Sequence, residues 1–252
     1  PPLTNEHERK VVAYHEAGHA LVAALTPQAD PVLKLTIVPR GQALGVTAFA
    51  PKNELRNYPR SYLEARMLVL LGGRAAEQII FNEITTGASD DLKRVTDMAR
   101  RMVSQFGMSE AIGQLNFGDN ESQPFLGSSI SQNRNYSEET AAKIDAEVRD
   151  IVEAAYKNTV QLLTENKDKL DSLAQALLTR EVIEQSEMMK LIGMSLDEAK
   201  ADETAMKPTN GNHFALGHDH DEEDAKPSAP VNGNHSGDEQ PNEASEDPDH
   251  TS

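Results

Sequence analysis

Apolar residues recur at helical spacing along most of the first 196 residues, and this pattern predicts a mainly α-helical domain. The first helix is expected over residues 6–25, with a cap at Thr4 or Asn5 and a stop at Pro27. Its apolar stripe consists of Val11, Tyr14, Gly18, Leu21 and Leu25. One face of this helix is therefore expected to pack on a core.

Five further helices are predicted downstream of the first. They cover residues 61–81, 89 to about 105, a long stretch that begins after 137, 170–178 and 180–191. Gly72 and Gly73 fall inside the first of these, which indicates a kink or a close contact with another helix. Ser89 and Ser137 are expected caps, and Gly107 is an expected left-handed stop.

Strand patterns are rarer along the chain than helical ones. Two short apolar or β-branched runs, 33–38 and 44–49, flank turn residues 39–41 and predict a hairpin. A candidate strand at 114–117 lies within an irregular connection rich in Gly, Asn and Ser. The predicted fold class is mainly α-helical, with one small β-hairpin or sheet.

The last part of the chain, residues 197–252, differs sharply in composition. It holds 15 acidic and three basic residues and so contributes −12 of the formal charge of −17. Apolar periodicity ends there, which predicts a disordered acidic tail. Five of the eight histidines lie in this tail and are read as incidental to a solubilising segment. The predicted organisation is a domain at 1–196 followed by the tail at 197–252.

Composition narrows the function classes further. The acidic balance gives nucleic-acid binding no electrostatic support. No run of 18 apolar residues and no secretion signal is present, so the chain as given is expected to be soluble. Cysteine is absent, so a metal site must use histidine and carboxylate ligands. Because the sequence begins with Pro1, the chain is expected to be processed or cut from a longer protein.

The most informative segment is H-E-A-G-H at residues 15–19. His15 and His19 are four residues apart on a predicted helix, so both imidazoles project from one face and can share a metal ion. Glu16 follows the first histidine, where its carboxylate can take a proton from water and later give it to a leaving amine. Zinc suits these ligands and lowers the pKa of bound water to about 7. The segment predicts a zinc-dependent peptidase.

A catalytic zinc normally has three protein ligands, so one more group is needed. His7 lies two turns upstream of His15, too far along the helix axis to complete the set. The third ligand must then be a carboxylate. Asp91, in the first turn of a predicted helix, is modestly preferred over Glu77 and Asp90.

Six segments spread over about residues 6–192 share the pattern of one family. They are A-Y-H-E-A-G-H-A at 13–20, V-P-R-G-Q-A-L-G-V-T at 38–47, L-G-G-R-A-A-E-Q at 71–78, T-T-G-A-S-D-D-L at 85–92, Q-F-G-M-S at 105–109 and N-Y-S-E-E-T-A at 135–141. On these segments the chain resembles the peptidase domain of the FtsH family of membrane-anchored, ATP-dependent zinc metalloproteases.

The resemblance implies roles for individual residues. His15, His19 and Asp91 look like the family's zinc ligands, and Glu16 looks like its catalytic glutamate. Glu77 falls where the family keeps a glutamate near the site, which suggests that it orients a ligand imidazole. Asp90 stands where relatives often carry Asn. The strand residues Leu44, Gly45, Val46 and Thr47 resemble the family's substrate-side strand, which pairs with an unfolded polypeptide through its main chain.

The resemblance also implies partners that this chain does not contain. The sequence has no phosphate-binding G-x-x-x-x-G-K-[ST] loop, so ATP is expected to act only through an ATPase module N-terminal to the peptidase in a parent protein. The parent is expected to be a homo-oligomer, a hexamer, and to be anchored to a membrane with the peptidase on the cytoplasmic, stromal or matrix side. The expected function is endoproteolysis of unfolded or membrane-extracted polypeptides.

Two alternatives remain open beside that function. The first is a non-catalytic, peptidase-like module that supports oligomerisation or binds partners. The second keeps the chemistry but completes the zinc site with Glu77 in place of Asp91.

Overall fold

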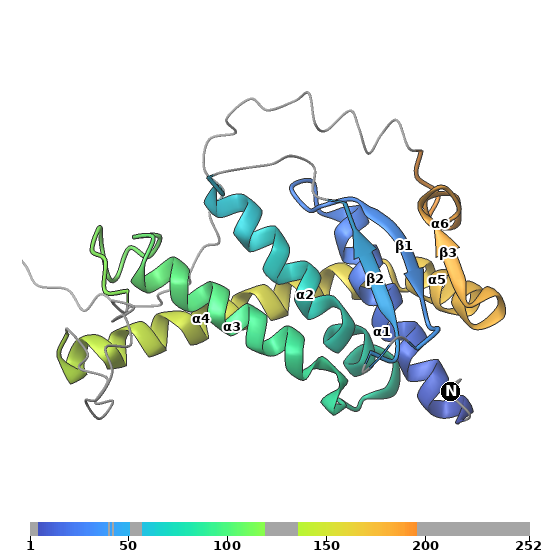
Figure 1. The fold of residues 1–252 in the computed structure, drawn as a ribbon, viewed down its shortest axis with the longest axis horizontal. Helices are drawn as coiled ribbons and strands as arrows, with labels where there is room; N and C mark the ends of the chain where they lie inside the picture. Colours follow the sequence, from blue (N-terminus) through green and yellow to red (C-terminus); the bar gives the residue numbers. More distant parts are fainter. Residues whose placement is uncertain (1–4, 40, 42, 51–56, 119–135, 196–252) are drawn as a thin grey trace, which may run out of the picture. The chain divides into compact units, whose positions relative to one another are not determined.

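Six α-helices and a three-stranded sheet make up the described part of the computed structural model, which comprises residues 5–39, 41, 43–50, 57–118 and 136–195 (Figure 1). The elements are α1 (Glu6–Leu25), β1 (Val32–Thr36), β2 (Val46–Phe49), α2 (Arg60–Phe81), the 3-10 helix η1 (Thr86–Ala88), α3 (Ser89–Ser104), α4 (Glu138–Glu165), α5 (Lys167–Arg180), β3 (Val182–Glu184) and α6 (Gln185–Leu191). The predicted mainly helical fold class is confirmed. The predicted tail at 197–252 and its boundary lie outside the described residues.

Helix α1 is the most enclosed element and contacts α2, α4, α5, β1 and β2. It begins at the cap Asn5, whose side chain accepts hydrogen bonds from the backbone N–H groups of His7 and Glu8. From Val12 to Ala23 almost every side chain is buried, because small residues let neighbouring elements approach from several sides. This burial fixes the direction of the side chains in the H-E-A-G-H segment.

Two groups of buried apolar residues form the core. One surrounds α1 and the sheet and includes Leu21, Leu35 and Leu173. The other lies between α2, α3 and α4 and includes Met67 and Met102. Because α2 contributes to both groups, it holds α1 on one side and α3 on the other, as Figure 1 shows.

Helices α1 and α2 cross at a pair of glycines. A Cβ atom built on Gly18 would lie 2.3 Å from the Gly72 carbonyl oxygen, and one built on Gly72 would lie 2.7 Å from the Gly18 carbonyl oxygen. Backbone therefore packs directly on backbone, which only glycine allows. Of the two features predicted at Gly72 and Gly73, a kink or a close contact, the close contact is present at Gly72, and α2 continues through both glycines.

Substituting Gly18 with Ala is expected to lower the free energy of unfolding by about 2 kcal/mol. The added methyl group gains about 1 kcal/mol in helix propensity, but overpacking against rigid backbone costs up to about 3 kcal/mol. Thermal unfolding of the metal-free chain measures this effect without any contribution from a bound ion. A Gly18→Ala variant as stable as the unaltered chain would show that the helices can separate at no cost.

The sheet has the order β2-β1-β3, and both pairings are antiparallel. The predicted hairpin is present as β1 and β2, in which Leu35 pairs with Thr47. Strand β2 begins at Val46, two residues later than predicted, and Leu44 and Gly45 precede it. One edge of β2 has no neighbouring strand within the described sheet.

The third strand corrects the prediction of a helix over 180–191. Glu181 ends α5 in the left-handed conformation, with φ of 62°, and its backbone N–H donates to the Leu177 carbonyl. The β-branched pair Val182 and Ile183 then extends beside β1, where Ile183 is fully buried. Only the second half of the predicted helix, α6, is helical.

Two further local predictions were wrong. Residues 114–117 form no strand, because the backbone N–H of Phe117 bonds to the Ser104 carbonyl at the end of α3 and not to a neighbouring strand. Ser89 does not cap α3, since η1 precedes the helix and Ala88 occupies the cap position. The predicted cap at Ser137 and the left-handed Gly107 are both present. None of the described helices combines the length and the apolar character that a bilayer crossing requires.

Candidate metal centre

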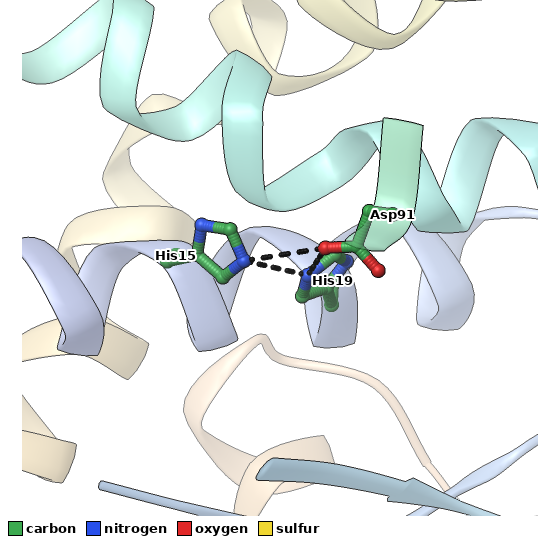
Figure 2. Close-up of side chains that lie close together, drawn as sticks. All are labelled: His15, His19 and Asp91. Atoms are coloured by element: carbon green, nitrogen blue, oxygen red, sulfur yellow. Dashed lines mark hydrogen bonds and ion pairs between the residues drawn. The ribbon is translucent and has the colours of Figure 1, made fainter. Parts of the chain in front are cut away.

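Two imidazoles from α1 and one carboxylate from α3 converge at the junction of α1, α2 and α3 (Figure 2). The Nε2 atoms of His15 and His19 lie 3.0 Å apart. The Asp91 Oδ2 atom lies 3.5 Å from the first of these nitrogens and 3.3 Å from the second. Within the described residues, this is the group of His, Asp and Glu side chains whose geometry suits a metal ion.

The hydrogen bonds at the far side of each ring fix the tautomers. His19 Nδ1 lies 2.7 Å from the Val69 carbonyl oxygen, which can only accept, so Nδ1 carries the proton. His15 Nδ1 lies 2.7 Å from Glu77 Oε1 and donates to it in the same way. In the neutral rings, both Nε2 atoms thus present lone pairs toward each other and toward a carboxylate oxygen. Because two lone pairs and a carboxylate oxygen repel one another at these distances, a proton or a metal cation is needed between the three atoms.

The spacing of the three atoms fits zinc. With zinc–ligand distances near 2.0–2.1 Å, the edges of a tetrahedron are about 3.3 Å long. The three measured separations, 3.0, 3.3 and 3.5 Å, bracket that length. Nitrogen and carboxylate oxygen donors suit this ion, and three protein ligands leave a fourth position open. The residues present therefore fit a catalytic zinc ion.

In the metal-free site, the close approach of the imidazoles and carboxylates shifts the pKa values of His15 and Asp91. Burial lowers the pKa of His15, but the hydrogen bonds to Asp91 and Glu77 outweigh it and raise the pKa to about 9. Burial likewise opposes ionisation of Asp91, yet the two imidazoles hold the pKa of that carboxyl well below its usual range. The site is therefore built to keep its carboxylates ionised and to attract positive charge.

Glu77 connects two of the candidate ligands. This side chain is 1% exposed, and its second oxygen, Oε2, accepts a hydrogen bond of 2.8 Å from the Thr85 backbone N–H. Burial raises the pKa of Glu77, but the bonds to His15 and Thr85 outweigh it and lower the pKa below its ordinary value. Because Thr85 starts the turn that leads into α3, Glu77 orients His15 and also fixes the segment that delivers Asp91.

The turn before Asp91 is stabilised by its own cap. The Thr85 hydroxyl accepts a hydrogen bond of 3.1 Å from the Gly87 N–H, which fixes η1 and so the start of α3. Asp91 lies in the first turn of α3, where the helix dipole favours a carboxylate. Its neighbour Asp90 has a side chain that is 80% exposed and faces Arg94 at 4.0 Å. Of the two adjacent aspartates, Asp91 is the one that reaches the histidines.

A glycine makes room for the His15 ring. A Cβ atom built on Gly73 would lie 2.5 Å from both Cε1 and Nε2 of His15. Any side chain at position 73 would push the His15 imidazole away from the other two candidate metal ligands, His19 and Asp91. His7, the remaining histidine of α1, contacts the Phe81 ring edge-on instead and takes no part in the cluster.

Glu16 is held from the side of the sheet. The Thr47 hydroxyl lies 2.6 Å from Glu16 Oε2 and 3.2 Å from the Glu16 carbonyl oxygen. Gly45 packs so closely that an added Cβ atom would lie 2.7 Å from Glu16 Oε1. Glu16 is 6% exposed. The Glu16 carboxylate is thus contacted on one side by Gly45 and Thr47, at the start of β2.

The residues predicted as a substrate strand are divided by the structure. Val46 and Thr47 lie in β2, whereas Leu44 and Gly45 lie in the irregular segment before it. Leu44 is 41% exposed, whereas Gly45 lies against Glu16. The four residues therefore do not form one uniform strand.

Three contacts of the site were not found from the sequence. The Val69 carbonyl, the Thr85 N–H and the Thr47 hydroxyl each fix a candidate functional side chain from a distant element. Two of them are backbone groups, which leave no signal in residue type. Thr47 was assigned to the substrate strand, and its contact with Glu16 depends on a register that the sequence does not reveal.

A helix that carries His15, Glu16 and His19, completed by a carboxylate from a second helix, defines the chain as a metallopeptidase domain. The family model of peptidase family M41 matches residues 2–191, and the chain belongs to this family. The expected resemblance to the FtsH peptidase domain is confirmed.

Curated relatives agree with this membership. The chain is 47% identical over 213 residues to the ATP-dependent zinc metalloprotease FtsH of Magnetococcus marinus. This alignment covers 82% of this chain and 32% of the relative. It is 50% identical over 194 residues to the chloroplastic ATP-dependent zinc metalloprotease FTSH 1 of Oryza sativa subsp. japonica, with 75% of this chain and 28% of the relative covered. The chain spans about a third of the length of the relatives it matches.

Proposed function

We propose that this chain is a zinc metalloendopeptidase domain that cleaves unfolded polypeptides. The observation that carries the proposal is the convergence of His15 Nε2, His19 Nε2 and Asp91 Oδ2 at tetrahedral edge distances. Glu16, on the same helix, is the group available for proton transfer. A zinc ion held by the three ligands would act as a Lewis acid that activates water and polarises the substrate carbonyl.

The protein's own groups have distinct roles in this proposal. Glu16 takes a proton from the attacking water and passes it to the nitrogen of the leaving amine. Glu77 and the Val69 carbonyl hold the two imidazoles by their Nδ1–H groups, so that both Nε2 atoms face the metal position. The near-complete burial of Glu77 keeps water away from that bond.

Substrate is proposed to bind along β2. This strand lies at an edge of the described sheet, and a backbone edge can pair with an extended peptide of almost any sequence. Glu16 lies directly beneath the start of β2, as its contacts with Gly45 and Thr47 indicate. A peptide bound at that edge would pass close to the catalytic glutamate. Leu44, exposed just before the strand, would contact substrate side chains.

The whole protein is proposed to join this domain to an ATPase module, as the names of the FtsH relatives suggest. ATP would then act through that module, and its role would be to deliver unfolded or membrane-extracted chains. A homohexamer, anchored to a membrane with the peptidase on the cytoplasmic, stromal or matrix side, is the assembly proposed. The acidic tail at 197–252 is proposed to be separate from the peptidase domain.

The test is zinc content together with hydrolysis of casein, an unfolded protein. The purified chain is expected to retain about one zinc ion and to release casein fragments until a chelator removes the metal. Activity should return when zinc is added back. Absence of bound zinc would contradict the metal site. A zinc-loaded chain that cleaves neither casein nor a short peptide would favour the non-catalytic binding module instead.

A further inference from the structure

Thr47 is placed to hold the catalytic glutamate as well as to line the substrate strand. Its hydroxyl lies 2.6 Å from Glu16 Oε2. An ionised carboxylate can only accept a hydrogen bond, so Thr47 is the donor. A short hydrogen bond to a buried, charged acceptor is among the stronger ones in proteins. This contact is therefore strong enough to select one orientation of the Glu16 side chain.

The donor itself is rigid. The backbone of Thr47 pairs with Leu35 of β1, which is fully buried. Threonine is branched at Cβ, and its χ1 angle is restricted in a strand. Glu16, in contrast, has three rotatable side-chain bonds, and ordering them costs conformational entropy. The fixed hydroxyl thus restrains the flexible carboxylate.

The opposite side of Glu16 is restrained by close packing. A Cβ atom added to Gly45 would lie 2.7 Å from Glu16 Oε1, 2.8 Å from Glu16 Cγ and 2.8 Å from Val12 Cγ1. Gly45 therefore lets the chain lie directly on the glutamate, two residues before Thr47 supplies its hydrogen bond. Together the two residues enclose the carboxylate from the sheet side.

We infer that Thr47 is a positioning residue, which fixes the Glu16 carboxylate in the orientation needed for proton transfer and ties that orientation to the substrate-binding strand. The inference rests on the proposed peptidase function. The Thr47 hydroxyl then binds the Glu16 carboxylate, while the Thr47 main chain remains free to pair with a substrate peptide.

The kinetic test compares Thr47→Val, which removes the hydroxyl but keeps the shape, with Thr47→Ser, which keeps the hydroxyl. On casein, Thr47→Val is expected to lower kcat roughly 10- to 100-fold, with KM and zinc content unchanged. Thr47→Ser is expected to retain most of the activity. An unchanged kcat in Thr47→Val, or a raised KM alone, would overturn the inference. Loss of zinc, or equal loss of activity in both variants, would also overturn it.

A second test needs no activity and separates the two oxygens that the hydroxyl can reach. Thr47→Val is made in the unaltered chain and in Glu16→Ala, and the thermal midpoint of each metal-free protein is measured. If the hydroxyl holds the carboxylate, Thr47→Val should lower the midpoint much less when Glu16 is already Ala. Equal shifts would show that the hydroxyl serves the Glu16 main-chain carbonyl, 3.2 Å away, and would overturn the inference.

The two tests also distinguish the failure of this inference from the failure of the proposed function. If the unaltered, zinc-loaded chain cleaves neither casein nor a short peptide, the proposed function fails. The thermal comparison then still decides whether Thr47 holds the Glu16 carboxylate.

Discussion

Replacing Glu16 with Gln is expected to lower kcat for casein hydrolysis roughly 10²- to 10⁴-fold, the usual contribution of a general base. An amide has the shape of the carboxylate but cannot accept and return a proton. Its carbonyl oxygen can still accept the hydrogen bond from Thr47, so the local structure should be preserved. Zinc content should not change, because the three candidate ligands are on other residues.

The matched control for this substitution is Glu8→Gln. Glu8 belongs to the same helix and its side chain is exposed, so the same loss of one charge should leave kcat unaltered. Both variants are compared with the unaltered chain at equal zinc content. A Glu16→Gln variant that keeps the full rate would remove Glu16 from the chemistry, and a parallel loss in Glu8→Gln would point to a nonspecific effect of charge.

Features that depend on neighbours in the sequence could be predicted from the sequence. Three such features depend on residues within one helical turn: the cap expected at Thr4 or Asn5 and found at Asn5, the cap at Ser137, and the pairing of His15 with His19. The regular geometry of an α-helix places such residues without knowledge of the rest of the fold. This is why the histidine pair and the adjacent glutamate were identified before the third ligand.

Features that depend on distant pairing could not be predicted in the same way. Val182 and Ile183 fall within the helix predicted over residues 180–191, but pairing with β1 supplies hydrogen bonds that favour the extended conformation. The choice between Asp91, Asp90 and Glu77 likewise depends on the turn at Thr85, whose position is fixed by a buried carboxylate 8 residues earlier. Residue types alone left all three candidates open, and the family resemblance selected Asp91.

The geometry assigns different tasks to these carboxylates. Asp91 faces the Nε2 atoms of both histidines, whereas Glu77 faces the Nδ1 atom of His15 and the Thr85 N–H. A group on the Nδ1 side cannot share an ion with the Nε2 atoms, so Glu77 can only act through the imidazole and the turn. Asp90 points away from the site and pairs loosely with Arg94. The three side chains should therefore differ sharply in their effect on zinc binding.

We expect Asp91→Asn to weaken zinc binding roughly 10²- to 10³-fold. A structural zinc site contributes about 10–16 kcal/mol in total, or about 3 kcal/mol for each of four ligands, and a neutral amide is a poor substitute for a carboxylate. Glu77→Gln should weaken binding only about tenfold, because the amide oxygen still accepts from His15 Nδ1, although the amide NH2 group cannot accept from the Thr85 N–H. Asp90→Asn, the exposed neighbour, should have no effect.

Competition with a chromophoric chelator measures zinc affinity for all three variants under one condition, and each loses one negative charge. The order of the losses, and not their absolute size, decides the assignment, since the change in net charge is identical in every case. If Glu77→Gln weakened zinc binding more than Asp91→Asn, the roles of the two carboxylates would be reversed and Glu77 would be the ligand. If Asp90→Asn matched Asp91→Asn, the effect would come from the charge near the site and not from coordination.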